Sequence, residues 1–499
     1  DRTRTLDMLR SFLRQNAVPT ALAMRATNQV SEKLDREQIL VEQDVPALAL
    51  LSAALRSELM HETRAPHLVA HPLFQMWQDL DMTAVRALCE DAVGVTFLSN
   101  QDVLFVPGSR AEQAYCVVRG RLCYTQVPES SMVSEETETE VHQGAWLSEA
   151  ALFSNWVHVG MLEATTACQL LHVGGAELLR VVELHVPIAR MTRDYGRNFH
   201  ARLAAAVPPH APWPNDLQVA FTSAGELLSR DVGLALLKRA KRSGLVSPEH
   251  RELLEEHVRC GRCALQPAAG GGGLECSLSE VSLRLEQDGH RFWQVGSWDE
   301  AHGVRMVSKL PSVWRAVGEL PQPALERLLS SKLKPLAPYI LVEETQHTPK
   351  RSESSEYGIP TTGVHTLHLA SLRDPGREVD VPVAQLNEAC DVPGPGNILP
   401  RVVHALPDGD GFALYSWLLP HEREVLEEPS QAAHWQQWLD SLDLRQLREP
   451  ERGAWAQADE VSEETSLTRP LSRAPLCLQA GRAAGSATVT SAWSRRVSA

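Results

Sequence analysis

Apolar residues recur at helical spacing over the first seventy residues, and this spacing predicts a run of short helices. Leu6, Leu9 and Leu13 lie on one such face. Pro19 and Pro46 mark breaks, because the residue before a proline is disfavoured in the helical region. Few of these helices carry enough apolar residues to close a core alone, so we expect them to dock against other surfaces.

The pattern changes after Asp81, where a helix over residues 82–90 gives way to short apolar runs typical of strands. The acidic stretch from Glu129 to Glu140 contains no Lys or Arg and is interpreted as a solvated loop. A long amphipathic helix, interrupted at Pro187, follows the last strand. The strands expected are 95–98, 103–106, 115–118, 122–126, 160–164 and 169–173.

Prolines concentrate at residues 206–217 and predict a stiff linker at the end of a domain. A helical segment at 218–264 follows, with one helix opened by a capping box from Ser223 to Glu226 and another by Ser247 and Pro248. Beyond a flexible joint at residues 268–273, strand and helix patterns over 275–429 predict an α+β domain. Residues 458–499 lack periodicity and are predicted to be disordered.

Composition narrows the class of protein. A length of 499 residues indicates several domains, and the formal net charge of −15 argues against a nucleic-acid partner. Nine irregularly spaced cysteines favour a reducing compartment. No apolar run approaches the roughly 20 residues of a membrane-spanning helix. The first residues, from Asp1, carry no secretory signal, and we expect the chain to be the later part of a longer protein.

Two short runs and several single positions resemble a known family. The family is the voltage-gated channels of the ether-à-go-go, hyperpolarisation-activated and cyclic-nucleotide-gated superfamily. LRSFLRQNAVP at residues 9–19 is similar to the first helices of their C-linker. HPLF at residues 71–74 is similar to the segment that enters their binding domain. The other matching positions are the turn glycines Gly108, Gly120 and Gly144 and the aromatic residues Tyr195 and Phe199 of the final helix.

The resemblance implies an α+β multidomain fold. Residues 1–70 would be a helical C-linker, and residues 71–205 a β-roll of the cyclic-nucleotide-binding type with flanking helices. The Pro-rich linker at 206–217, the helical segment at 218–264, the smaller α+β domain at 275–429 and the disordered tail at 458–499 would follow.

The nucleotide pocket implied by the resemblance is degenerate. Its residues here are Gly144, Ser148, Glu149, Ala150 and His158. In the family a Gly-Glu pair caps a short helix and binds the ribose, and an arginine binds the cyclic phosphate. Ser148 replaces the glycine and His158 the arginine. An imidazole of ordinary pKa is mostly neutral at pH 7, so cAMP or cGMP binding is not expected. We interpret His158 as a surface or loop histidine and Glu149 as a cap or structural hydrogen-bond acceptor.

Two further patterns suggest chemistry only weakly. Cys260, Cys263 and Cys276, with His257 close by, have partial zinc-ligand spacing, but the second CxxC pair is missing, and no metal or other cofactor is expected. Residues 310–333 resemble a Nudix box that keeps Glu319 and Arg327. Leu328, Ser331 and Lys332 stand where that box has metal-binding glutamates, so the α+β domain would be a degenerate Nudix-like domain used for interaction.

The resemblance implies the cytoplasmic gating and regulatory region of a tetrameric voltage-gated cation channel, with potassium as the favoured ion. Its partners would be identical subunits, through the C-linker, and the channel's own transmembrane pore upstream. A soluble regulatory or scaffold protein with a borrowed β-roll is the alternative, and a Nudix-type hydrolase is a remote one. No nucleophile elbow, Walker loop or HExxH motif supports an enzyme.

Overall fold

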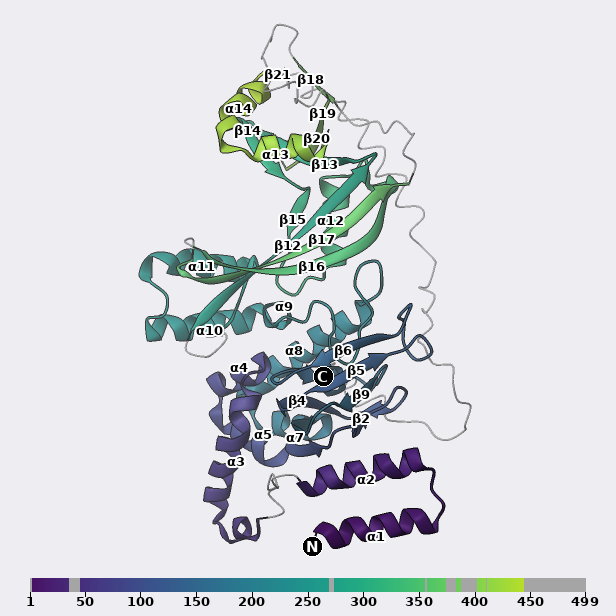
Figure 1. Cartoon of the computed structure of the whole chain (residues 1–499). Coiled ribbons are helices and arrows are strands. Elements are labelled where there is room, and N and C mark those ends of the chain that lie inside the picture. The colour runs from purple at the N-terminus through teal and green to yellow at the C-terminus, as the bar shows by residue number, and fades with distance from the viewer. Residues whose placement is uncertain are drawn as a thin grey trace, which may run out of the picture. The chain divides into compact units, whose positions relative to one another are not determined.

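Helices and antiparallel sheets alternate along the chain, which is a mixed α/β protein as predicted (Figure 1). This computed structural model describes residues 2–35, 45–268, 273–354, 357–373, 383–386, 402–409 and 411–443. The described residues up to Asp443 belong to one compact unit. The predicted tail at 458–499 and the centre of the predicted joint at 268–273 lie outside the described residues.

The first two helices form a hairpin, with the predicted break at Pro19. Helix α1 (Arg2–Gln15) and helix α2 (Thr20–Asp35) contact each other. Leu6 and Leu13 are the buried residues of α1, whereas Met8 and Phe12 are 61% and 59% exposed. The hairpin therefore buries one apolar face and leaves a second one uncovered.

Three helices then lead into the first pair of sheets. Each of the last two is capped by the side chain that precedes it. His71 Nδ1 accepts a hydrogen bond from Leu73 N, and Asp81 Oδ1 accepts one from Thr83 N, so both helices begin where orphan backbone donors are satisfied. The elements are the 3-10 helix η2 (Pro46–Leu50), α3 (Ala53–Leu68), α4 (Pro72–Leu80) and α5 (Met82–Asp91).

Two four-stranded antiparallel sheets, in the orders β1-β10-β4-β7 and β2-β9-β5-β6, share one hydrophobic core. Gly120 at φ 101° makes the turn between two of these strands, where a Cβ atom would come within 2.5 Å of Ala167 O. The strands are β1 (Val93–Leu98), β2 (Val103–Phe105), β4 (Gln113–Arg119), β5 (Leu122–Gln126), β6 (Thr137–Val141), β7 (Trp146–Leu147), β9 (Met161–Ala164) and β10 (Cys168–Gly174), with β3 (Arg110–Ala111) paired to β8 (Trp156–Val157).

The acidic stretch from Glu129 to Glu140 was predicted to be a loop along its whole length, and this is wrong for its second half. Its second half forms β6, which pairs with β5 from Leu122 to Gln126. The first four residues of β6 are exposed, so an edge strand can carry these glutamates in solvent. Charge alone therefore located the surface, but it did not distinguish a loop from an exposed strand.

Helices close the two-sheet unit. The predicted long helix is divided at Pro187 into α7 (Gly175–Leu184) and α8 (Val186–Ala205), and a short helix α6 (Ala150–Phe153) follows β7. The Pro-rich segment at 206–217 is not a free spacer, because Ala206, Ala211 and Asp216 are buried. It lies packed against the unit whose end it was predicted to mark.

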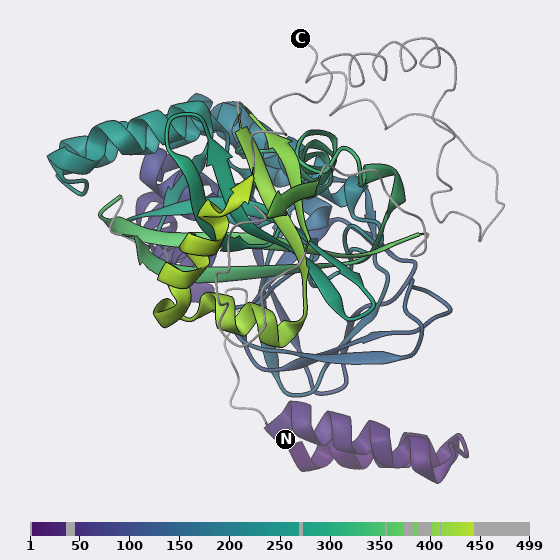
Figure 2. The same ribbon diagram turned by 90° about the horizontal axis from the view of Figure 1, so that it is seen from above.

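The helical segment after residue 218 consists of α9 (Ala224–Leu227), α10 (Arg230–Ser243) and α11 (Pro248–Cys260). Helices α10 and α11 contact each other; they lie one above the other in Figure 1 and overlap when they are seen from above in Figure 2. Ser223 and Ser247 are N-cap residues, as predicted. The predicted capping box is wrong in detail, because the Ser223 hydroxyl donates to the Glu226 carboxylate and accepts no backbone hydrogen bond.

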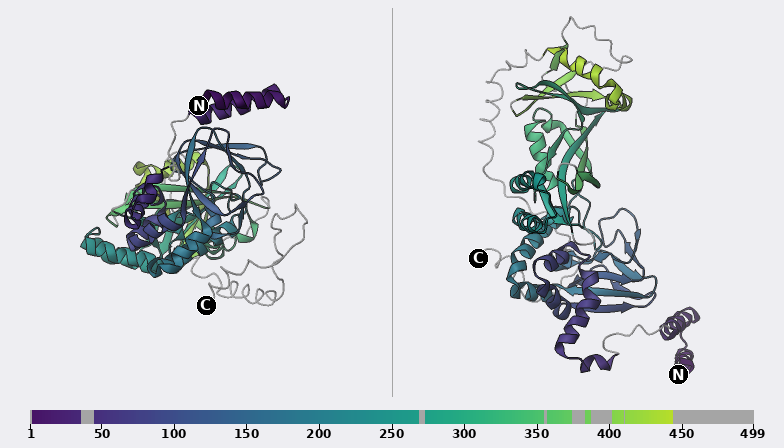
Figure 3. Two further views of the ribbon diagram at one scale, coloured as in Figure 1. Left: turned by 90° about the horizontal axis from the view of Figure 1, so that it is seen from below. Right: turned by 90° about the vertical axis from the view of Figure 1, so that its left-hand side faces the viewer.

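A large sheet forms the rest of the described chain. Its long strands β12 and β17 are parallel, whereas its other pairs of neighbours are antiparallel. Helix α12 (Pro321–Ser331) packs on this sheet through Ala324, Leu325 and Leu328, and Figure 3 shows it along the strands. The main path is β16 (Ile340–Ser354), β17 (Ile359–Leu372), β12 (Leu274–Gln287), β13 (His290–Asp299), β20 (Gly411–Leu418), β19 (Val403–Asp408), β18 (Val383–Leu386) and β21 (Leu442–Asp443).

Shorter elements complete the sheet region. They are β11 (Cys263–Pro267), β14 (Gly303–Lys309), β15 (Ser312–Trp314), η3 (Ala337–Tyr339), α13 (Pro420–Glu427), η5 (Pro429–Gln431) and α14 (Ala432–Asp440). One hydrophobic core runs from α3 and α4 through α8, α10 and α11 to β11 and β12. The helical segment is therefore joined to both sheet regions by buried apolar contacts.

Candidate functional site

The segment between β7 and β9 makes a sharp turn at Ser148. This serine has φ 54°, in the left-handed region that favours glycine, and it is 1% exposed. Its backbone N–H donates to Asp216 O at 2.6 Å. Its hydroxyl lies 3.4 Å from His158 Nδ1. The position at which the channel family that the sequence resembles has glycine thus has a glycine-like backbone conformation, and it contacts the Pro-rich segment.

Asp216 is the centre of this site. Its side chain is fully buried. Oδ1 accepts from Trp156 Nε1 and from His158 Nδ1, both at 2.7 Å. Oδ2 accepts from the Tyr124 hydroxyl at 2.8 Å and from the backbone N–H groups of residues 159 and 160 at 3.0 and 3.1 Å. Five donors from the two-sheet unit therefore converge on one carboxylate.

Asp216 is held ionised by these donors. Burial favours the neutral carboxyl, but hydrogen bonds from His158, Trp156 and Tyr124 outweigh it and lower the pKa of Asp216 below its ordinary value. Burial, together with the Asp216 charge, raises the pKa of the Tyr124 hydroxyl. An ionised carboxylate only accepts hydrogen bonds, so the proton of the shared bond lies on His158 Nδ1.

His158 corrects the interpretation from the sequence. It is 4% exposed, and its ring stacks on Phe105 with the centroids 3.8 Å apart. It lies outside helices and strands, but it is not a surface residue. Because its Nδ1 proton is directed to Asp216, the imidazole is engaged within the chain.

Glu149 points to a different set of partners. His71 Nδ1 accepts from Leu73 N, so His71 Nε2 carries the proton and donates to Glu149 Oε1 at 3.0 Å. The Tyr195 hydroxyl donates to the same oxygen at 3.4 Å. Glu149 is thus a hydrogen-bond acceptor that connects α6 to the cap of α4 and to α8. Burial, and then the Glu149 charge, raises the pKa of Tyr195.

The two remaining pocket residues lie beside this cluster. Gly144 has φ 87°, and its N–H donates to Val117 O in the turn before β7. Ala150 is buried and begins α6. The structure brings Ser148 and His158 together on Asp216, whereas Glu149 joins other helices and Gly144 only shapes the turn.

Asp216 was missed by the sequence analysis. The Pro-rich segment that contains it suggested a linker, and a lone aspartate there carries no motif. The neighbouring Asn215 caps its own turn, with Oδ1 accepting from Leu217 N and Gln218 N. The one available signal was His158, because the channel resemblance places it where that family has a phosphate-binding arginine, and such a position suggests that an anion lies near.

The cysteine candidates do not assemble into a site. Cys260 is exposed at the end of α11, and Cys263 and Cys276 are buried on the paired strands β11 and β12. His257 Nδ1 lies 2.7 Å from the Tyr357 hydroxyl. Over the described ranges, no group of three or more His, Cys, Asp or Glu side chains could hold a metal ion.

The Nudix-like residues form an ion pair instead of a carboxylate cluster. Arg327 Nη2 lies 2.9 Å from Glu319 Oε2 and 2.8 Å from Trp314 O. Leu328 packs in the core under the sheet, and Lys332 pairs with Asp408 at 2.9 Å. The arginine therefore neutralises the glutamate that the Nudix resemblance would assign to a cation.

Comparison with known proteins adds no family. No family model matches the chain, and no curated protein is significantly similar to it. Among the helices that the structure describes, none combines the length and the apolar character that a membrane span requires.

Proposed function

We propose that the chain is the cytoplasmic gating and regulatory region of a tetrameric voltage-gated cation channel, with potassium as the favoured ion. In this proposal residues 71–205 are a β-roll of the cyclic-nucleotide-binding type, and Asp216 takes the place of the nucleotide phosphate. The β-roll would then couple to the channel gate with Asp216 in its anion position, and it would need no cyclic nucleotide.

The observation that carries the proposal is the set of hydrogen bonds to Asp216. Ser148 and His158 are the positions that match the glycine and arginine of the family's phosphate-binding turn, and both contact this one residue. The Asp216 carboxylate accepts from the His158 imidazole and from the backbone N–H groups of residues 159 and 160, whereas the Ser148 N–H donates to the main-chain carbonyl of Asp216. A carboxylate with such donors resembles a bound phosphate in charge and acceptor chemistry. The segment that supplies it follows α8, so the occupant belongs to the same chain.

A path for regulation runs from this site to the first helices. Glu149, adjacent to Ser148, accepts from His71 at the start of α4 and from Tyr195 on α8. His71 also packs against Trp146, with ring centroids 4.8 Å apart. Displacing the 148–158 segment would disturb the start of α4, which α3 and α5 adjoin. In a channel those helices would connect to the C-linker.

The exposed apolar residues of α1 and α2 support an assembly through the C-linker. Met8, Phe12, Leu22 and Met24 are each more than half exposed. Met8 and Phe12 line one hollow on α1, and exposed apolar side chains that gather in this way are typical of an interface. In the proposal, identical subunits cover it in a ring below the pore.

The alternative of a soluble regulatory protein shares the roll but not the pore. The hydrolase alternative is not favoured, because Glu319 is paired with Arg327 and Lys332 with Asp408.

The discriminating experiment records currents from the full gene product in a heterologous membrane. We expect a voltage-activated current whose half-activation voltage shifts in Asp216→Asn and not in the exposed control Asp91→Asn. Absence of current, with folded protein recovered from the soluble fraction, would favour the soluble alternative.

A further inference from the structure

A second buried cluster of charges lies between α8, α9 and the segment after β15. Arg315 pairs through Nη2 with the Glu226 carboxylate, and the side chains are 2% and 1% exposed. Arg202, also 2% exposed, donates from Nη1 to Asn198 O at 3.0 Å and from Nη2 to Glu226 O. Two guanidinium groups and one carboxylate are thus held together away from solvent.

The charges in this cluster do not balance. Glu319 lines the same cavity, but its carboxylate is matched by Arg327 at 2.9 Å. His347 Nε2 lies 4.0 Å from Glu226 Oε2, and burial lowers the pKa of His347 to about 4, so its ring is neutral at pH 7. Among the described residues that line the cavity, Glu226 is therefore the one carboxylate that Arg202 and Arg315 share. A buried, uncompensated positive charge is costly unless an anion accompanies it.

Both guanidinium groups have lowered pKa values in this cluster. Burial, with the charge of Arg202 as the next cause, lowers the pKa of Arg315 to about 9. Burial also lowers the pKa of Arg202 to about 10. Within the described residues, Arg202 Nε and Arg315 Nη1 are buried donor atoms without a hydrogen-bond acceptor. Each is an N–H group suited to an anion.

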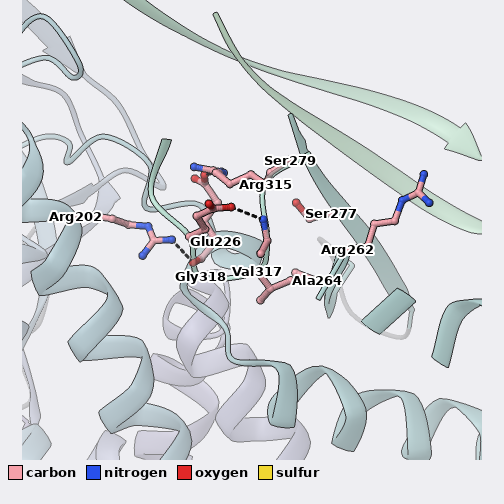
Figure 4. A pocket seen from close by; sticks show the side chains of 12 residues that line it. Arg202, Glu226, Arg262, Ala264, Ser277, Ser279, Arg315, Val317 and Gly318 are labelled. Carbon is pink, nitrogen blue, oxygen red and sulfur yellow. Dashed lines mark hydrogen bonds and ion pairs between the residues drawn. The ribbon is translucent and has the colours of Figure 1, made fainter. Parts of the chain in front are cut away.

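The cavity beside these donors is small. Its volume is about 10 Å³, which is room for one water-sized group. Ser277 and Ser279 line it, and Gly225 keeps it narrow, because a Cβ atom there would lie 2.6 Å from Ser277 Cβ. Figure 4 shows Arg202 and Arg315 near Glu226, whereas Arg262 points away; its guanidinium lies over Trp314, 5.5 Å from the ring centroid.

We propose that this cavity binds one monatomic anion, and that in cells the anion is chloride. Guanidinium N–H groups and serine hydroxyls are donors that a halide can accept, and the ion would restore charge balance around Glu226. A phosphate or nucleotide is too large for the cavity. The ion would strengthen the contact between α8 and the segment after β15, and this site is independent of the Asp216 site.

The test uses the full chain in buffers of constant ionic strength and pH, in which gluconate replaces chloride. Chlorine NMR should show excess line broadening that saturates with chloride and is reversed by bromide. The melting midpoint should rise by about 1–2 °C when chloride reaches about tenfold its dissociation constant. No saturable broadening in the native protein would overturn the proposal.

Three variants assign the effect to the cluster. Arg202→Met should reduce the excess line broadening at least about fivefold, because it removes the surplus charge. Glu226→Gln should increase chloride affinity, since both guanidinium charges then lack a carboxylate. The matched control Arg197→Met, at an exposed arginine of the same helix α8, should behave as the native chain.

The outcomes separate cleanly. If the excess chlorine line broadening is unchanged in Arg202→Met, the site does not lie at these residues. If inorganic phosphate reverses the broadening as well as bromide does, the site is not specific for a monatomic ion. If Arg202→Met does not fold, Glu226→Gln decides the matter, because weaker chloride binding in that variant would contradict the proposal and tighter binding would support it.

Discussion

Asp216 Oδ1 lies 2.7 Å from His158 Nδ1, although 58 residues separate the two in the chain. This pair joins the segment after α8 to the turn between β8 and β9. It explains why a histidine is buried at this position, where the channel family that the sequence resembles has an arginine. The imidazole has an anionic partner within the chain, so it requires no external ligand.

Replacing Asp216 should destabilise the two-sheet unit. In Asp216→Asn the amide can accept through only one of its two terminal atoms, so either the Oδ1 donors, Trp156 Nε1 and His158 Nδ1, or the Oδ2 donors, among them the Tyr124 hydroxyl, lose their acceptor. We expect a loss of about 2–4 kcal/mol in the free energy of unfolding, measured by denaturant titration. The exposed control Asp91→Asn should change it by no more than about 0.5 kcal/mol. Equal stability of the two variants would contradict the central position of Asp216.

Acid should destabilise the chain in two separate ranges of pH. Burial lowers the pKa of His347 and of His368 to about 4, so the folded chain binds protons less readily than the unfolded chain. Their contribution is present above the unfolded pKa of about 6.5 and is lost as the pH falls towards 4. The pKa of Asp216 is also lowered, but from the ordinary value of a carboxyl group. Its contribution to the free energy of unfolding is therefore lost only below about pH 4.

The variant His368→Gln tests the first of these ranges. Glutamine can still bond Thr345, whose Oγ1 lies 2.8 Å from His368 Nδ1, but it does not titrate. Between pH 6 and 4.5 the slope of unfolding free energy against pH should fall by about 1.4 kcal/mol per unit. The exposed control His142→Gln should keep the native slope. An unchanged slope in His368→Gln would show that His368 is not buried in its neutral form.

The sequence predicted the elements better than their contacts. Helix and strand periodicity located α1, α5 and six of the strands from β1 to β10, because it depends only on near neighbours in the chain. The site depended on Asp216, which a Pro-rich composition concealed, since proline content indicates local stiffness and not what a segment packs against. The cluster of Arg202, Glu226 and Arg315 was missed because each residue comes from a different element, so no local sequence pattern connects the three.

Glu319 and Arg327 form an ion pair near the surface. Because Arg327 is 44% exposed, Glu319→Gln should change the free energy of unfolding by less than about 1 kcal/mol. We also expect no magnesium-dependent hydrolysis of nucleoside diphosphate derivatives by the native chain. Turnover that disappears in Glu319→Gln would move the hydrolase interpretation ahead.

Self-association should depend on the uncovered face of the first hairpin. Phe12 is 59% exposed, so Phe12→Ser should leave the fold intact and weaken assembly of the full chain, as measured by light scattering. The control Val106→Ser changes an exposed apolar residue of the roll and should leave assembly unchanged. A native chain that stays monomeric at high micromolar concentration would count against a gating ring.

Calorimetric titration of cAMP and cGMP into the full chain tests the central claim, that Asp216 fills the roll, most directly. We expect no binding to the native chain or to His158→Arg alone, since Asp216 still occupies the turn. The double variant Asp216→Ala with His158→Arg should gain at least about tenfold in affinity, because an arginine fork then faces a vacated anion position. Low-micromolar binding by the native chain, or equal gain from His158→Arg with Asp216 intact, would contradict the account.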